Sequence, residues 1–250
     1  KLAVLRAADG AGATALAAGS RWRMRRLLIL CYHGVAMNDE HEWSGLYVSR
    51  EFFRRRMELV RAAGCNVVPL DEALDRLSGG RLPERAVAIT FDDGFHDFYR
   101  AAFPAAASFG YPVTPYLTTY YVEYQRPVFD PMCSYLLWKA RGRGRLDWPE
   151  VLPGGAALDE TGREAAARRI KQHALARRLS GADKDGLLRE MAGRLGLDYD
   201  ELCRRRVLHL IDPEEARELA RRGVAIEMHT HRHRVYRGQP RMFAELDDNR

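Results

Sequence analysis

The chain has 250 residues, enough for one large domain or two small ones, and 46% of them are hydrophobic, as in a globular protein with a core. It contains no stretch of about 18 uncharged apolar residues, so a membrane-spanning helix is not expected. The formal net charge of +6 comes mostly from arginines spread along helical segments beside many acidic residues. This pattern indicates a solvated surface and not a nucleic-acid site, and attraction to an anionic polymer or membrane surface is the alternative.

The first 23 residues are rich in Ala and Gly and lack the continuous apolar run of a secretory signal. We expect residues 1–23 to form a flexible arm, residues 24–250 to form one domain, and the protein to be cytoplasmic. The four cysteines lie far apart, which predicts neither a zinc finger nor a disulfide framework. Cys31 and Cys65 lie in apolar runs, where cysteine usually behaves as a small buried hydrophobic residue.

Short apolar runs alternate with helical patterns in the first half of the chain. Strands are predicted over residues 27–32, 65–68, 86–91 and 113–118, and helices over residues 49–64, 71–77 and about 94–109, the last with a break expected at Pro104. The apolar run at residues 27–32 is of the kind that is buried on both faces of a parallel sheet. The alternation of strand and helix favours right-handed βαβ units and a parallel sheet or barrel, which is an α/β fold.

The pattern changes to helices alone between about residues 125 and 212. Helices are predicted over residues 130–141, 160–179 and 184–195, without a convincing strand, and another helix opens at Pro213. We interpret residues 125–212 as a helical insertion, for which the sequence indicates no chemical role. A fifth strand is predicted at residues 224–228 and a last helix near Arg241. Because a closed barrel needs more units than five strands, the barrel is expected to be truncated at its C-terminal side.

Polar clusters follow three of the predicted strands directly. His33 follows residues 27–32, Asp92-Asp93-Gly94 follows residues 86–91, and His229-Thr230-His231-Arg232-His233 follows residues 224–228. In parallel α/β folds, catalytic groups gather at the carboxyl ends of the strands. The three clusters therefore predict one active site.

Two adjacent carboxylates in a regular strand would point to opposite faces, but Gly94 permits a sharp turn that brings Asp92 and Asp93 toward one pocket. Two unpaired carboxylates there would repel each other, whereas a divalent cation on one of them leaves the other ionised as a base. An Asp-Asp-Gly sequence also occurs in ordinary turns and helix caps, and this alternative stays open.

His229 and His233 lie four residues apart and can converge on a metal, while His231 is expected to face elsewhere. One carboxylate and two imidazoles form a three-ligand site with open positions for water. A polar loop with solvated imidazoles is the alternative.

Both clusters resemble motifs of the polysaccharide deacetylases of carbohydrate esterase family 4. Thr90-Phe91-Asp92-Asp93-Gly94 resembles the first motif of that family and residues 229–233 the second, and the resemblance extends over about residues 27–119 and 207–250. It implies a distorted (β/α) barrel in which Asp92 is the general base and Asp93, His229 and His233 bind a divalent metal. Zn²⁺ is the first expectation for this metal, with Co²⁺, Mn²⁺, Ni²⁺ or Fe²⁺ as alternatives.

The motifs that normally supply the general acid in this family would lie after Arg250. However, Leu30-Cys31-Tyr32-His33 resembles the biofilm poly-N-acetylglucosamine deacetylases, in which the motif order is permuted. This resemblance implies that His33 is the general acid. A hydrogen-bonded structural histidine is the alternative.

The implied activity is a metal-dependent hydrolase that removes N-acetyl groups from a polysaccharide or amino-sugar oligomer, using metal-activated water and an Asp base. An acetylated glycan is the expected partner, whereas the particular glycan and the oligomeric state are left open. One alternative is an O-acetyl esterase on a decorated polysaccharide, and another is a non-catalytic carbohydrate-binding remnant. A mononuclear iron oxygenase could use the same two-His-one-carboxylate set, but such enzymes usually have a β-sandwich fold.

Overall fold

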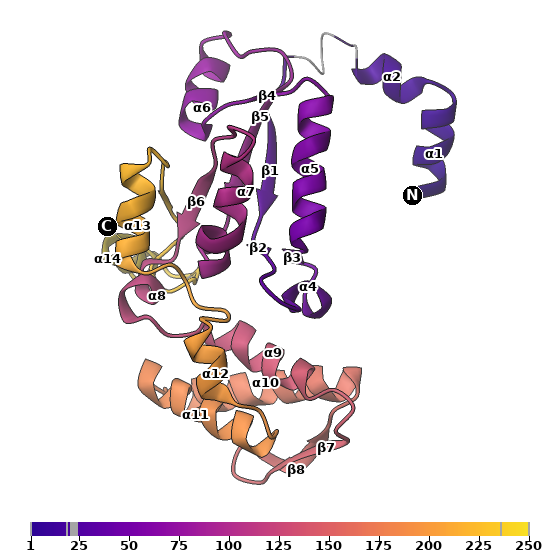
Figure 1. Cartoon of the computed structure of the whole chain (residues 1–250). Coiled ribbons are helices and arrows are strands. Elements are labelled where there is room, and N and C mark those ends of the chain that lie inside the picture. Colours follow the sequence, from indigo (N-terminus) through magenta and orange to yellow (C-terminus); the bar gives the residue numbers. More distant parts are fainter. Residues whose placement is uncertain (1, 19, 21–24, 236, 250) are drawn as a thin grey trace.

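The computed structural model describes residues 2–18, 20, 25–235 and 237–249, most of which form two packed bodies (Figure 1). The sheet body is built on five strands, and the helical body consists of residues 129–204. The strands of the sheet body are β1 (Leu28–Tyr32), β4 (Asn66–Val67), β5 (Ala86–Phe91), β6 (Thr114–Leu117) and β9 (Glu227–Met228). They pair in the order β1-β5-β6-β9, with β4 beside the start of β5, and every pair is parallel. The predicted α/β class is thereby confirmed, and the described strands form an open sheet.

Helices cover one face of this sheet. They are α5 (Arg50–Ala62), α6 (Leu70–Ser78), the π-helix η1 (Phe98–Ala102), α7 (Phe103–Ala107) and α13 (Pro213–Arg221). Helix α5 begins as predicted, because the Ser49 hydroxyl accepts a hydrogen bond from the backbone N–H of Phe52 at 3.1 Å. Phe53 and Met57, one turn apart on α5, are fully buried against the sheet. Pro104 does not end the predicted helix. Proline has no backbone N–H to donate, and the helix adopts the wider π-helical turn η1 just before Pro104 and then continues as α7.

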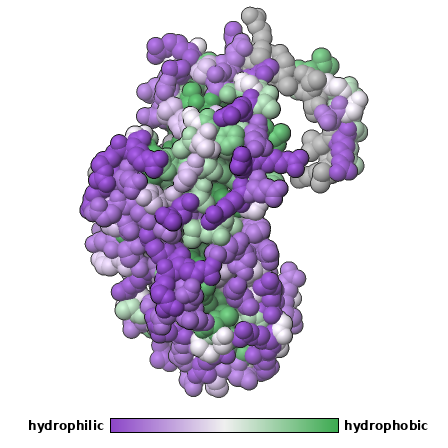
Figure 2. All heavy atoms as spheres, viewed as in Figure 1, coloured by the Kyte–Doolittle hydropathy of each residue, from purple (hydrophilic) through white to green (hydrophobic). Residues whose placement is uncertain are grey.

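The two faces of the edge strand β1 differ in burial. Val87, Ile89 and Phe91 of β5 contribute to the core under the helices, together with Leu28 and Tyr32 of β1. The alternate residues of β1 point to the other face, where Ile29 is 46% exposed and Cys31 is exposed. The expectation that this strand is buried on both faces, with Cys31 inside, is therefore wrong. Figure 2 shows hydrophobic atoms at the surface along the middle of the sheet body.

The helical body has a hydrophobic core of its own. It contains α9 (Phe129–Lys139), β7 (Arg145–Trp148), β8 (Leu152–Ala157), α10 (Glu160–Ala176), α11 (Gly181–Arg194) and α12 (Tyr199–Arg204). The antiparallel β7–β8 hairpin contradicts the prediction that this region lacks strands. Leu146 and Trp148 alternate inward in β7 and are 1% exposed, but the strand is short and β8 contains Gly154-Gly155, which weakens any strand signal.

Smaller elements complete the chain. They are α1 (Leu2–Gly10), α2 (Ala13–Ala18), β2 (Gly34–Val35), α4 (Glu40–Trp43), β3 (Tyr47–Val48), α8 (Thr119–Tyr124) and α14 (Gln239–Asp248). Much of the predicted arm at residues 1–23 is thus helical, and α1 and α2 extend away from the sheet body (Figure 1). The predicted strand at 224–228 is reduced to two residues. Among the helices described, none has both the length and the apolar character needed to span a bilayer.

Candidate metal centre and its neighbours

The parallel register brings the polar clusters to one edge of the sheet. Tyr32 of β1 pairs with Phe91 of β5, so the residues that follow them, His33 and Asp92, emerge side by side. The backbone N–H of Asp92 also donates to the carbonyl of Tyr32 at 2.8 Å. On the other side of β5, Leu117 ends β6, and its carbonyl accepts from the backbone N–H of His229 at 2.8 Å. The ends of four strands therefore meet, and the three polar clusters singled out in the sequence lie at this edge of the sheet.

A turn of left-handed backbone separates the two adjacent carboxylates. Asp93 has φ of 71° and Gly94 has φ of 75°, conformations that cost a non-glycine residue free energy. A Cβ atom on Gly94 would lie 2.2 Å from Cδ2 of Leu117, so the Leu117 side chain would have to move to admit one. This turn sends Asp92 toward β1 and Asp93 toward the loop after β9.

Asp93, His229 and His233 form a compact group. The Oδ1 atom of Asp93 lies 3.4 Å from Nε2 of His229 and 3.0 Å from Nε2 of His233. Two ligand atoms of one tetrahedral cation are separated by roughly 3.3 Å when each lies about 2.0–2.1 Å from the ion. These three atoms therefore have the spacing and the chemistry of a shared cation site.

The surroundings of Asp93 fit a cation. Its Oδ1 atom is buried, and no N–H or O–H of the described residues points at it with hydrogen-bond geometry. Burial acts to raise the pKa of Asp93, but the neighbouring His233, His33 and His229 imidazoles outweigh burial and hold the pKa below its usual range. The carboxylate is thus ionised and faces imidazole nitrogens, which is the state and the setting that a divalent ion requires of a ligand.

The loop that carries the two histidines is strained and is held from both sides. Thr230 has φ of 63° and His233 has φ of 56°. From α14, the fully buried Glu245 accepts hydrogen bonds from the backbone N–H of Arg232 and, at 2.9 Å, from its guanidinium. Buried His231 turns away from the cation group, as predicted, and its Nδ1 lies 2.9 Å from Oγ1 of Thr119. No sequence signal points to Glu245, because a single glutamate in a helix is usually solvated.

Asp92 belongs to a second group, with His33 and Cys31. Its Oδ2 atom lies 3.9 Å from Nε2 of His33 and accepts a hydrogen bond from the Cys31 thiol at 3.4 Å. Burial raises the pKa of Cys31, so the thiol is protonated and able to donate at neutral pH. Sequence reasoning missed Cys31, although its position two residues before His33 in a strand puts both side chains on one face.

Comparison with known proteins identifies the family of this chain. The family model described as polysaccharide deacetylase matches residues 79–248. Since this match covers well over half of the sequence, the chain belongs to the polysaccharide deacetylase family, which confirms the resemblance seen in the two motifs.

Individual relatives match smaller parts. The poly-beta-1,6-N-acetyl-D-glucosamine N-deacetylase of Escherichia coli (strain K12) is 29% identical over 98 residues, which cover 39% of this chain and 14% of that protein. The structure of Streptococcus pyogenes deacetylase PplD in complex with acetate matches at 25% identity, with a TM-score of 0.37, over 40% of this chain and 45% of that one. The structure of IcaB from Ammonifex degensii matches at 22% identity, with a TM-score of 0.36, over 66% of this chain and 80% of that one. The chain thus spans less than half the length of the first two of these relatives.

Proposed function

We propose that this protein is a metal-dependent hydrolase that removes N-acetyl groups from a polysaccharide or an amino-sugar oligomer. The observation that carries the proposal is the division of two adjacent carboxylates, with Asp93 beside two imidazoles and Asp92 beside a third. Membership of the polysaccharide deacetylase family and the name of the E. coli relative support the same chemistry.

Asp93, His229 and His233 would hold the cation, with Zn²⁺ as the first expectation because one carboxylate and two imidazoles suit it. Co²⁺, Mn²⁺, Ni²⁺ and Fe²⁺ accept the same ligands. When bound, such an ion supplies Lewis acidity for a carbonyl oxygen and for water. His231 takes no part in holding it, since this ring is bound to Thr119.

The proton transfers fall to Asp92 and His33. Asp92 removes a proton from the water that attacks the acetyl carbon, because Asp93 is the carboxylate assigned to the cation. His33 donates a proton to the nitrogen as the C–N bond breaks. Acetate and a free amine are the products, so the neutral acetamide becomes a cationic amino group on the glycan.

The position of His33 suits this role. Its Nε2 atom lies 3.9 Å from Oδ2 of Asp92, and the two side chains are 30% and 25% exposed. The pair is therefore too far apart for a direct hydrogen bond but close enough for both groups to reach one acetamide. The exposed face of β1 leaves this side of the site open to a polymer.

The proposal is tested by incubating the zinc-loaded protein with N-acetylglucosamine oligomers and measuring both acetate and primary amine. We expect equal amounts of the two products, and Asp92→Asn should lower the rate by about 10²- to 10⁴-fold. Asp147→Asn, on the distant β7 strand, is the matched control and should retain the rate. Acetate without amine from an O-acetylated polymer would identify an esterase instead, and unchanged release by Asp92→Asn would refute the assignment of the base.

A further inference from the structure

A cleft leads away from the cation group toward the helical body. Two adjoining hollows of about 360 and 190 Å³ form it and share five lining residues, and the larger one reaches His233. The shared residues come from both bodies: Tyr121, Phe129, Lys184, Arg232 and Arg234. A polymer that presents one sugar to the cation group would therefore lay its neighbouring sugars along this cleft.

Basic side chains outnumber acidic ones in the lining. The basic residues are Arg126, Lys171, Lys184, Arg232 and Arg234, and the acidic residues are Asp130 and Asp185. Some of this charge is already neutralised within the protein, which determines what remains for a ligand.

Two of the basic residues have acidic partners. Arg232 is paired with Glu245 at 2.9 Å and with Asp248 at 2.7 Å. Lys171 lies 3.7 Å from Asp130.

The other three basic residues form no direct ion pair. In the part of the chain that the structure describes, no carboxylate lies within 4.0 Å of the charged nitrogens of Arg126, Lys184 or Arg234. Three positive charges therefore line the cleft without a carboxylate in direct contact.

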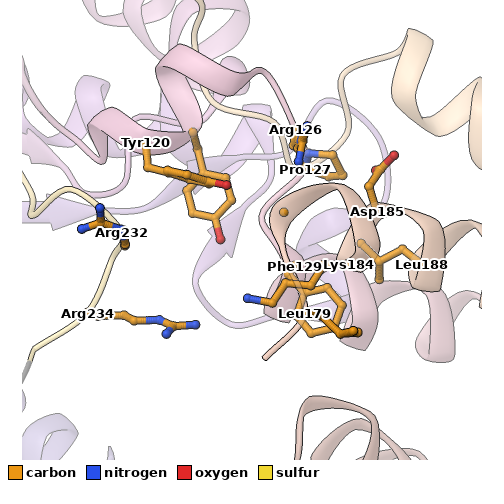
Figure 3. Close-up of a pocket in the computed structure, with 12 residues that line it drawn as sticks. Tyr120, Arg126, Pro127, Phe129, Leu179, Lys184, Asp185, Leu188, Arg232 and Arg234 are labelled. Carbon is orange, nitrogen blue, oxygen red and sulfur yellow. The ribbon is translucent and has the colours of Figure 1, made fainter. Parts of the chain in front are cut away.

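Lys184 and Arg234 point toward one another across the cleft, from α11 and from the loop after β9 (Figure 3). Burial and the charge of Arg234 lower the pKa of Lys184, and Asp130 offsets these effects only in part. Two converging cations without an anion between them repel each other, so an oxyanion placed there would be held by both.

The cleft also offers surfaces for the body of a sugar. Tyr120, Tyr121 and Phe129 line it, together with the aliphatic side chains of Leu179 and Leu188. The cleft is narrow where α11 begins, because a Cβ atom at Gly181 would lie 2.5 Å from the Tyr120 hydroxyl. Aromatic rings beside a few directed charges are typical of a specific ligand site and not of a solvated surface.

We propose that this cleft selects anionic glycans, in which a sugar next to the acetylated one carries a carboxylate or phosphate bound between Lys184 and Arg234. The inference rests on the proposed function for the position of the acetylated sugar. It adds the class of substrate, an acidic N-acetylated polysaccharide, to that function.

The test compares an anionic oligosaccharide with its neutral counterpart and with a second anionic oligosaccharide. The first is an oligomer of alternating N-acetylglucosamine and glucuronate, the second is the same oligomer after reduction of its carboxylates to alcohols, and the third is an N-acetylglucosamine oligomer joined by phosphodiesters. Calorimetric binding is measured with the Asp92→Asn protein, which retains its substrate, and acetate release is measured with the unaltered protein.

We expect at least one anionic oligomer to bind about tenfold more tightly than the reduced one, with the advantage shrinking as salt is added. Lys184→Gln and Arg234→Gln, each combined with Asp92→Asn, should each remove about tenfold of this affinity, whereas Lys184→Arg should retain it. The control is Arg55→Gln, which removes the same charge from the exposed surface of α5 outside the cleft and should change nothing. The preferred anionic oligomer then distinguishes a carboxylate from a phosphate.

Equal binding of the anionic and reduced oligomers would overturn the inference, as would unchanged affinity in Lys184→Gln and Arg234→Gln. Acetate release from neutral and anionic oligomers with equal efficiency would also overturn it while leaving the proposed function intact. Conversely, charge-dependent binding that is lost in Lys184→Gln, without acetate release from any oligomer, would support the cleft and refute the deacetylase.

Discussion

Asp92 and Asp93 are adjacent in the sequence, yet their carboxylates belong to different groups of side chains. Asp93 lies within 3.4 Å of two imidazole nitrogens from the loop after β9, whereas Asp92 accepts a hydrogen bond from Cys31 and lies near His33 on the opposite side. Left-handed backbone at Asp93 and Gly94 produces this separation. Each of the two carboxylates can therefore be tested alone.

Replacing Asp93 by Asn should abolish metal binding. The amide lacks the negative charge that attracts a cation, so we expect zinc affinity to fall by more than about a hundredfold, a larger loss than changes to the residues that support the ligands produce. Elemental analysis after dialysis measures the bound zinc. Asp92→Asn serves as the comparison, and it should retain zinc because the Asp92 carboxylate faces Cys31 and His33. Equal zinc loss in both variants would contradict the division of roles.

Replacing Gly94 by Ala should destabilise the fold. The added Cβ would meet Leu117 at 2.2 Å, and φ of 75° is unfavourable for alanine, so we expect a loss of about 2–4 kcal/mol in the free energy of unfolding. Urea denaturation measures it. The control is Gly186→Ala within α11, where no atom lies within 4 Å of the new Cβ, and which should stabilise the protein by about 0.5–1 kcal/mol. A neutral effect of Gly94→Ala would show that the turn relaxes freely.

Replacing Glu245 by Gln should weaken metal binding without touching a ligand. Glu245 is fully buried and holds Arg232, which lies between the two histidines in a loop with strained backbone. Loss of its charge should loosen this loop and lower zinc affinity by about tenfold, as outer-shell changes do. A chelator competition titration measures the affinity. Asp248→Asn removes the exposed partner of the same Arg232 and should have a smaller effect; similar effects of the two would argue against a special role for Glu245.

Acid should remove a stabilising contribution from Glu215. Burial acts to raise its pKa, but His96, the Asp212 backbone N–H and Arg206 outweigh burial and lower the pKa below its usual range. A carboxyl whose pKa is lower in the folded state stabilises the fold above the unfolded pKa of about 4.3. This contribution is lost as the pH falls from there through the folded pKa.

We therefore expect the free energy of unfolding to decrease with falling pH below about 4.3, and Glu215→Gln to flatten part of that decrease. Urea denaturation at pH 3 to 7 measures both curves. Glu58→Gln is the comparison, because Glu58 is 55% exposed and forms a surface ion pair with Arg54 of the same helix. An identical pH dependence in the parent protein and in Glu215→Gln would exclude this contribution.

The sheet and the reactive edge could be predicted because their signals are local. The run at Ala86–Phe91 is continuous and apolar, and the polar residues that follow it match a known motif. The β7–β8 hairpin was missed because β7 has only four residues and β8 contains Gly154-Gly155, so the strand pattern is too short to outweigh the helices around it. Cys31 was misplaced because the apolar run suggested burial on both faces, whereas only one face of β1 is covered.

Other parts of the site depend on contacts between distant segments. Glu245 acquires its role only when α14 folds against the loop after β9, and the pattern of α14 gives no hint of this contact. The cleft is assembled from Arg126, Lys184 and Arg234, which are remote from each other in the chain and belong to no common motif. The net charge of the sequence indicates only a generally basic surface. It cannot show that these three residues line the same cleft.

The residues of the cation group lie on both sides of the helical body in the sequence. Asp93 precedes the whole helical body in the chain, and His233 follows it. An ion bound by both residues would close a long loop of the chain that contains the whole helical body. The entropic cost of closing a loop rises only slowly with the length of the loop. The helical body could therefore vary in size between relatives with little change in the free energy of closing this loop. The helical body can therefore differ while the residues at the edge of the sheet stay in place.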